Sequence, residues 1–437
     1  MTILDRTTQH ATVAFLGGTL IDGTGAGPVP GATVVASRGR IVAAGPEGHV
    51  DVPADATRID VEGLTILPGL VDCHTHLGGA STMDYSDWVL EPDARQAINS
   101  TVQLRELMRH GVTTIRDISR NGLHLKWAVE NGRMAGPRIV ACGPGISRTG
   151  GHGDAYHLPC DLVQRSHPWA ILADGIEDVR KAVRMLNRMG ADAIKVWATG
   201  GGMWEKELET DQHFDLDELR MIVNEAAMVR LPVLAHCESL AATKDALRAG
   251  IATLEHGEEL DEECLAMITR QGVIMVPTLF LLLGPWWDEY PPPPREGLEH
   301  YRGATMGEKE KNRVADNFNA AREAGVTMAV GSDSFSSVEV PYGGATHGEV
   351  HRMVETGMPE MDAIVAATRN GAKALRVDHE TGTLERGKAC DLIAVEGDPL
   401  ADITILSADR LRLVVRDGRT WLDRRGDAST IHHGLLV

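Results

Sequence analysis

The central part of the chain alternates short apolar runs with longer stretches of helical period. Candidate helices such as 176–189 and 216–228 fall between successive candidate strands. Strands that alternate with helices build a parallel sheet, and eight such units in about 300 residues favour a closed (β/α)₈ barrel over an open sheet. The eight candidate strands are 64–71, 112–115, 138–141, 193–196, 233–235, 253–254, 272–276 and 326–330.

Both ends of the chain have a different pattern. Segments rich in β-branched residues and separated by Gly, Pro and Asp occupy residues 11–62, and similar segments return at 391–395 and 411–416. We therefore predict an α/β protein, a (β/α)₈ TIM barrel with a small β-sandwich domain formed by both termini. The predicted boundaries are 1–63 and 378–425 for the small β domain, 64–377 for the barrel and 426–437 for a C-terminal tail.

Charge and cysteine usage restrict the partners and the compartment. The chain has 43 Lys and Arg against 62 Asp and Glu, a formal net charge of −19, so we expect no nucleic-acid partner. No window approaches about 18 uninterrupted apolar residues, so we expect no membrane partner. The 6 cysteines form no CxxC pair. Unpaired thiols are typical of a reducing compartment, which predicts a cytoplasmic location.

Residues that can bind metals stand at the ends of the candidate strands. His74 and His76 follow the first strand two positions apart. Because side chains in a strand repeat every second residue, both imidazoles point the same way, as two ligands of one metal must. The carboxyl ends of parallel barrel strands lie on one face, so we expect four later residues to converge on these two histidines. These residues are Lys195, His236, His256 and Asp333.

With these motifs the sequence resembles the amidohydrolase superfamily, and the resemblance covers nearly the whole chain. The segments 149–154 and 247–257 are similar to the imidazolonepropionase-related branch. Within that branch the sequence resembles Xaa-Pro dipeptidases and ochratoxinase-like amidases.

The resemblance implies two divalent metal ions, usually zinc, and a Lys195 that CO₂ has carboxylated to a bridging carbamate. A bare ammonium beside two dications would be repelled, which is a physical reason for converting Lys195 to an anion. In the family pattern, Asp333 also accepts the proton of the attacking hydroxide and passes it to the leaving nitrogen. The pattern assigns the more buried metal to His74, His76 and Asp333, and the more exposed metal to His236 and His256.

The resemblance further implies an enzyme that hydrolyses an amide-type C–N bond by attack of a metal-bridging hydroxide. We expect a small-molecule substrate, either an Xaa-Pro dipeptide or an N-acyl amino acid, and a homo-oligomer. The same attack would also serve a xenobiotic carbamate, urea or aryl amide. Deamination is a further reading, but Lys195 counts against it, because the superfamily's mononuclear deaminases do not rely on a bridging lysine. A non-catalytic scaffold on this fold is the alternative of another class.

Four positions are candidates for substrate contact, and each has a structural alternative. His152 resembles the branch's substrate-contacting histidine, or is a loop histidine without a role. Gly201 either lets the backbone approach the substrate or forms a turn. Glu238 either selects a basic substrate group or stabilises the amino end of the following helix. Trp286, in the long connection 280–305, either covers an acyl group or packs against the protein.

Overall fold

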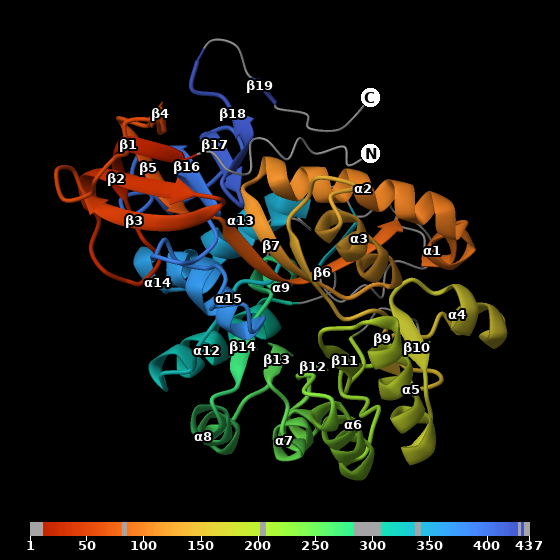
Figure 1. The fold of residues 1–437 in the computed structure, drawn as a ribbon. Helices are drawn as coiled ribbons and strands as arrows, with labels where there is room; N and C mark the ends of the chain where they lie inside the picture. Colours follow the sequence, from red (N-terminus) through yellow and green to blue (C-terminus); the bar gives the residue numbers. More distant parts are fainter. Residues whose placement is uncertain are drawn as a thin grey trace.

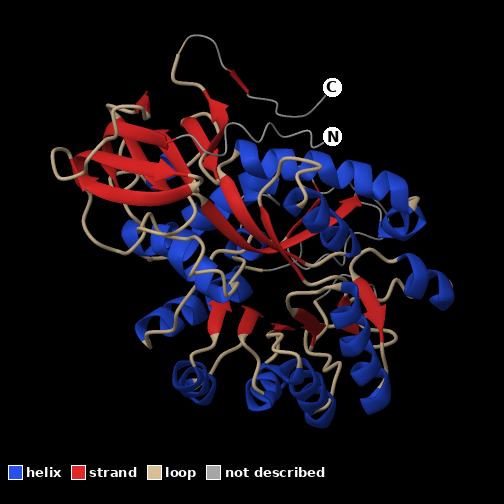
Figure 2. Ribbon diagram, viewed as in Figure 1, coloured by secondary structure: helices blue, strands red, loops and turns tan. Residues whose placement is uncertain are grey.

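The computed structural model describes residues 12–80, 85–201, 207–283, 307–336, 342–426 and 430–431. Figure 1 shows strands in the middle of the larger part of the molecule, with helices α5 to α8 on one side and α2 and α3 on the other. A separate sheet lies beside this part and contains strands from both ends of the chain, coloured red and blue. Figure 2 shows the same division, with helices around the central strands and few beside the second sheet.

The central strands pair in parallel throughout. Three hydrogen bonds join the segment 327–330 to the strands on either side of it, from Met275 N to Thr327 O at 3.0 Å, from Ala329 N to Met275 O at 2.9 Å and from Cys73 N to Val330 O at 2.8 Å. The TIM-barrel-type α/β fold predicted from the alternating pattern is therefore confirmed. The strands are β6 (Leu70–Ala80), β7 (Val112–Asp117), β8 (Arg138–Ala141), β9 (Gly145–Ser147), β10 (Ala170–Leu172), β11 (Ile194–Trp197), β12 (Val233–Cys237), β13 (Thr253–His256), β14 (Ile274–Val276) and β15 (Ser334–Ser336).

Local sequence signals mark the start of α6 and the end of α8. Asp215 accepts hydrogen bonds from the backbone N–H groups of Asp217 and Glu218, and Glu218 accepts one from the N–H of Asp215, which forms a capping box at the start of α6. Helix α8 ends at Gly272, whose φ of 68° is the left-handed conformation that glycine adopts without strain. The helices are α1 (Tyr85–Leu90), α2 (Asp93–Arg109), α3 (Arg120–Glu130), α4 (Cys160–Ser166), α5 (Gly175–Met189), α6 (Leu216–Met228), α7 (Leu240–Ala249), α8 (Glu262–Gln271), α9 (Leu279–Leu283), α12 (Glu308–Glu323), α13 (Tyr342–Glu355), α14 (Glu360–Val365) and α15 (Gly371–Ala374).

Strands from both ends of the chain form one 9-stranded sheet, mostly antiparallel. The two ends meet where β5 pairs with β16, with Leu392 opposite Pro68. That both termini build one β unit agrees with the sequence pattern, while its β-sandwich form and the domain boundaries stay predictions. The strands are β1 (Thr12–Leu20), β2 (Val29–Ser37), β3 (Arg40–Pro46), β4 (Thr57–Asp60), β5 (Leu64–Pro68), β16 (Leu392–Glu396), β17 (Leu411–Arg416), β18 (Arg419–Asp423) and β19 (Thr430–Ile431).

Two predicted strands differ from the observed ones by more than one or two residues at an end. The segment 64–71 is two strands, because the chain leaves the terminal sheet at the end of β5 and enters the barrel with β6. Gly69 lies between them, and a Cβ added there would lie 2.1 Å from Oγ1 of Thr113, so the chain passes too close to β7 for a side chain. The segment 326–330 forms a single bridge, between Met328 and Met275, and regular pairing with β6 begins only at β15.

Among the residues that the structure describes, no helix combines the length and the apolar character that crossing a membrane requires.

Candidate metal centre

The six side chains that we expected to converge do lie together at one end of the barrel. His74 and His76 come from β6, Lys195 from β11, and His236 and His256 from β12 and β13, while Asp333 directly precedes β15. Nζ of Lys195 lies 3.3 Å from Nε2 of His74. Oδ1 of Asp333 lies 3.0 Å from Nε2 of His76. The rings of His236 and His256 have their centroids 4.5 Å apart.

The potential ligand atoms form two groups. In the first group are His74, His76 and Asp333, and in the second are His236, Glu238 and His256. Within each group the donor atoms lie within 4.8 Å of one another, close enough to share one cation. The sequence predicted Glu238 as a substrate contact, whereas the structure also places its carboxylate beside two predicted ligands.

Two of the predicted ligands have unusual backbone conformations. His256 has a φ of 67° and Asp333 a φ of 52°, both in the left-handed region that residues other than glycine seldom adopt. Thr278, whose hydroxyl lies 2.7 Å from Nδ1 of His256, has a φ of 50°. Such conformations cost roughly 1–3 kcal/mol each and cluster at functional sites. The surrounding barrel therefore holds these residues in conformations that they would seldom adopt by themselves.

Burial keeps three of the predicted histidine ligands, His74, His236 and His256, uncharged. It lowers the pKa of His74 to about 4, with a further contribution from the positive charge of Lys195. It also lowers the pKa values of His236 and His256 well below their usual range. At neutral pH these rings are therefore neutral and carry lone pairs that can bind a metal.

Asp333 is a carboxylate in this environment. Burial alone would raise its pKa, but the nearby His74 and a hydrogen bond with His76 outweigh burial, so the pKa lies well below its usual range. Burial lowers the pKa of Lys195, whose side chain is fully excluded from solvent. Neutral imidazoles together with an anionic oxygen make a donor set that suits a divalent transition metal.

Hydrogen bonds on one side of each ring determine which nitrogen remains for a metal. Nδ1 of His76 donates to the carbonyl oxygen of Ile118 at 3.1 Å, and Nε2 of His236 donates to that of Gly200 at 3.0 Å. Because a carbonyl only accepts, neutral His236 keeps its lone pair on Nδ1, while Nε2 of His76 faces Oδ1 of Asp333 at 3.0 Å, the side on which a shared metal could lie. The arrangement therefore leaves Nε2 of His76 and Nδ1 of His236 as the nitrogens available to a metal.

Three of the four candidate substrate residues border these groups. The ring of His152 stacks on that of His236, with centroids 4.7 Å apart and planes at 25°. A Cβ added to Gly201 would lie 2.5 Å from Cε1 of His152 and 3.1 Å from Oε1 of Glu238, so Gly201 lies between these two side chains. Trp286 lies outside the described residues.

The sequence analysis missed several residues around the centre. Glu255 contacts His74 and Arg116 inside the barrel, Glu207 lies 2.9 Å from Nδ1 of His152, and the hydroxyl of Tyr342 donates to the carbonyl of His76 at 2.7 Å. The available signal was a charged residue directly after a candidate strand, as at Arg116 and Glu255. Such residues require a partner when a barrel buries them.

Comparison with known families agrees with this geometry. A model of the amidohydrolase family matches residues 65–421, which is most of the chain. The chain belongs to the amidohydrolase family. This match confirms the resemblance recognised in the sequence motifs. Members of this family are hydrolases.

Individual relatives of this amidohydrolase cover nearly its whole length. It is 32% identical to an ochratoxinase of Aspergillus niger over 91% of the chain and 84% of the relative. It is 29% identical to an imidazolonepropionase of Rhizorhabdus wittichii, over 89% of the chain and 92% of the relative. Its fold is similar to that of a Xaa-Pro dipeptidase solved with bound methionine in its active site, with a TM-score of 0.82 and 29% identity over 94% and 100% of the two chains.

Proposed function

We propose that this amidohydrolase is a binuclear metal-dependent enzyme that hydrolyses an amide-type C–N bond. The observation that carries the proposal is the arrangement of two three-residue donor groups at one mouth of the barrel, with Lys195 3.3 Å from His74. A non-catalytic scaffold would have no need to bury and strain this set of ligands.

The residues present fit a pair of divalent ions, most simply zinc. His74, His76 and Asp333 would hold one ion, and His236 and His256 the other, with a carboxylated Lys195 between them. Burial lowers the pKa of Lys195, and a neutral amine is the form that combines with CO₂. Bound there, two ions would activate water near neutral pH and polarise a carbonyl group.

The side chains of this chain would supply the proton transfers and the orientation of the substrate. Asp333, held as a carboxylate, would accept a proton from the nucleophilic water and deliver it to the leaving nitrogen. Nδ1 of His152 lies 2.9 Å from a carboxylate oxygen of Glu207, so Nδ1 carries a proton; Nε2–H can donate to the substrate as well when the ring is an imidazolium, whose charge Glu207 would balance. Such a donor can stabilise a carbonyl oxygen during the attack or bind a substrate carboxylate.

An Xaa-Pro dipeptide or an N-acyl amino acid is the substrate class that we propose. Both classes combine an amide carbonyl with a carboxylate, the two groups that the metal centre and His152 would bind. The similarity to a Xaa-Pro dipeptidase and to an ochratoxinase supports this choice. A cytoplasmic location and a homo-oligomer stay predictions.

The test combines metal analysis with a substrate panel. Protein supplied with zinc and bicarbonate should contain about two ions per chain and hydrolyse Xaa-Pro dipeptides or N-acyl amino acids. Aryl carbamates, ureas and aryl amides form the comparison arm. Fast turnover of a carbamate with no dipeptide hydrolysis would refute the substrate class. Protein that binds no metal after this treatment would refute the proposed chemistry.

A further inference from the structure

An ion pair lies inside the barrel, directly behind the predicted metal ligands. Glu255 precedes His256 on β13, and Arg116 lies on β7, with 0% and 2% of their side chains exposed. Nη2 of Arg116 donates to Oε1 of Glu255 at 2.6 Å, and Oε2 of Glu255 lies 2.9 Å from Nδ1 of His74. Replacing a buried ion pair by apolar residues is often neutral or stabilising, so stability alone is a poor reason for this one.

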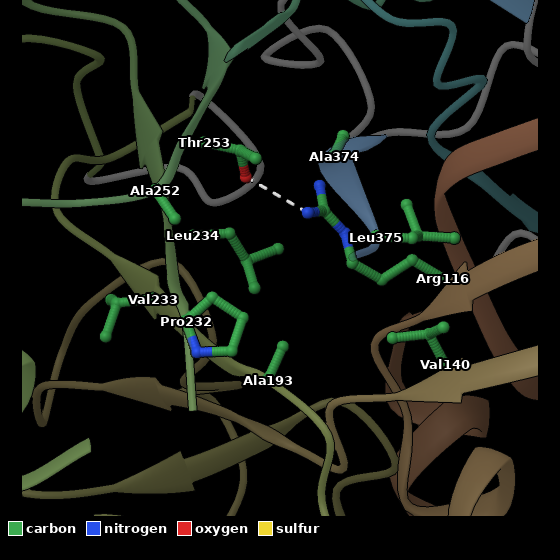
Figure 3. Close-up of a pocket in the computed structure, with 10 residues that line it drawn as sticks. All are labelled: Arg116, Val140, Ala193, Pro232, Val233, Leu234, Ala252, Thr253, Ala374 and Leu375. Carbon is green, nitrogen blue, oxygen red and sulfur yellow. Dashed lines mark hydrogen bonds between the residues drawn. The ribbon is translucent and has the colours of Figure 1, made fainter. Parts of the chain in front are cut away.

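Arg116 joins the two strands that carry ligands of different groups. Its Nε donates to the carbonyl of Cys73, the residue before His74, at 2.7 Å. Its Nη1 donates to the hydroxyl of Thr253 at 3.0 Å. Figure 3 shows the guanidinium of Arg116 reaching Thr253 across a pocket that residues from the beginnings of β12 and β13 help to line. Arg116 therefore holds β6 against β13 from beneath the metal centre.

The contacts of His74 specify one tautomer. Glu255, paired with Arg116, is a carboxylate that only accepts hydrogen bonds, so Nδ1 of His74 is the protonated nitrogen. Nζ of Lys195, 3.3 Å from Nε2, donates to the lone pair on that side. Nε2 is also the atom that faces Oδ1 of Asp333, at 3.4 Å. Both sides of the ring thus agree that Nε2 is the metal-binding atom.

We propose that Glu255, held by Arg116 and Thr253, is a positioning residue that fixes the metal-binding tautomer of His74. Arg116 would in addition set the spacing between the ligands of β6 and those of β13. This inference rests on the proposed function, because it concerns the metal that His74 would hold. Thr253 completes the arrangement by donating from its hydroxyl to Oε1 of Glu255 at 2.5 Å.

The first test compares the zinc affinities of two variants by competition with a chelator at pH 7. Glu255→Gln should weaken zinc binding roughly 10–100-fold, the usual effect of losing a carboxylate behind a metal-bound histidine. The matched control is Glu349→Gln, because Glu349 is also fully buried but accepts from the backbone N–H of Phe280 at 2.6 Å rather than from a ligand. Equal zinc affinity of Glu255→Gln and the wild type would overturn the inference. A wild-type protein that binds no zinc would instead refute the proposed function.

A second pair of variants tests the role of Arg116. Arg116→Met should lower zinc affinity in the same direction as Glu255→Gln. The zinc affinity of Arg138→Met should equal that of the wild type. Arg138 pairs at 3.3 Å with Asp391, which directly precedes β16 of the terminal sheet. Equal losses in the two arginine variants would show that Arg116 acts only through general stability.

A third measurement observes the tautomer of His74 in the wild-type protein. In metal-free wild-type protein with ¹⁵N-labelled histidines, the long-range ¹H–¹⁵N spectrum reports the tautomer of each ring. The signals of His74 are those that disappear in His74→Gln. We expect the form with the proton on Nδ1, and a proton on Nε2 would overturn the inference.

Discussion

Nζ of Lys195 lies 3.3 Å from Nε2 of His74, and both side chains are buried. A lysine thus lies directly beside a predicted metal ligand. An ammonium in this position would repel a cation bound by His74. Burial, the main influence on Lys195, lowers its pKa and so favours the neutral amine. The pair is therefore consistent with a lysine that becomes an anionic ligand, and it motivates the first prediction.

Lys195→Ala should reduce the metal content from about two ions per chain to about one or fewer, because the bridging ligand is lost. Turnover should fall with it. A short carboxylic acid such as propionate should restore part of both if it supplies the missing bridging carboxylate. Elemental analysis and initial rates measure the effect. Lys126→Ala, which removes an amine paired with Asp192 at 2.6 Å, is the control and should keep both metal and activity.

Asp333→Asn should lower kcat by roughly 10²–10⁴-fold, the usual contribution of a group that transfers a proton in the transition state. The amide retains an oxygen that can bind a metal but cannot accept the proton. The thermal midpoint of unfolding should change little. Wild-type rates in this variant would contradict the role of Asp333.

Gly201→Ala tests whether the backbone beside His152 contacts the substrate site. The new Cβ would lie 2.5 Å from Cε1 of His152 and would force that ring to move. A displacement of about 1 Å in such a group can cost about 100-fold in rate. We expect a loss of this size in kcat/KM with an unchanged metal content. Gly27→Ala is the control, because a Cβ there meets nothing within 4 Å; equal kinetics in the two variants would exclude His152 from the reaction.

Glu349 predicts a specific dependence of stability on pH. Burial raises its pKa from 4.5 to about 8, despite hydrogen bonds from the backbone of Phe280 and Leu279. Between these two values the folded protein holds a proton that the unfolded chain releases. The contribution of Glu349 to stability is therefore present below about pH 4.5 and is lost as the pH rises toward 8, by up to about 1.4 kcal/mol per pH unit.

Glu349→Gln removes this titration, since the amide is neutral at every pH. The variant should gain stability relative to the wild type between pH 5 and pH 8, as followed by urea unfolding of metal-free protein. A constant difference across this range would show that Glu349 is already ionised in the folded protein.

Much of the fold follows from local patterns. Alternation of apolar strands and amphipathic helices predicts the barrel, and the parallel direction of its strands brings the ends of β6, β11, β12 and β13 to one face. For this reason His74 and His256 could be placed together although they lie 256 − 74 = 182 positions apart. The family resemblance added the expected roles of these residues.

The sequence by itself determined which residue types stand at the strand ends and which of them share a face. The reason is that successive side chains in a strand alternate between its two faces. Only the tertiary structure decided what lies behind and between them. The register that brings Glu255 under His74, the path of Arg116 across the barrel and the place of Glu238 beside His236 all depend on contacts between distant strands. Such contacts are set by the packing of the whole barrel interior, where each side chain takes the space and the partners that its neighbours leave.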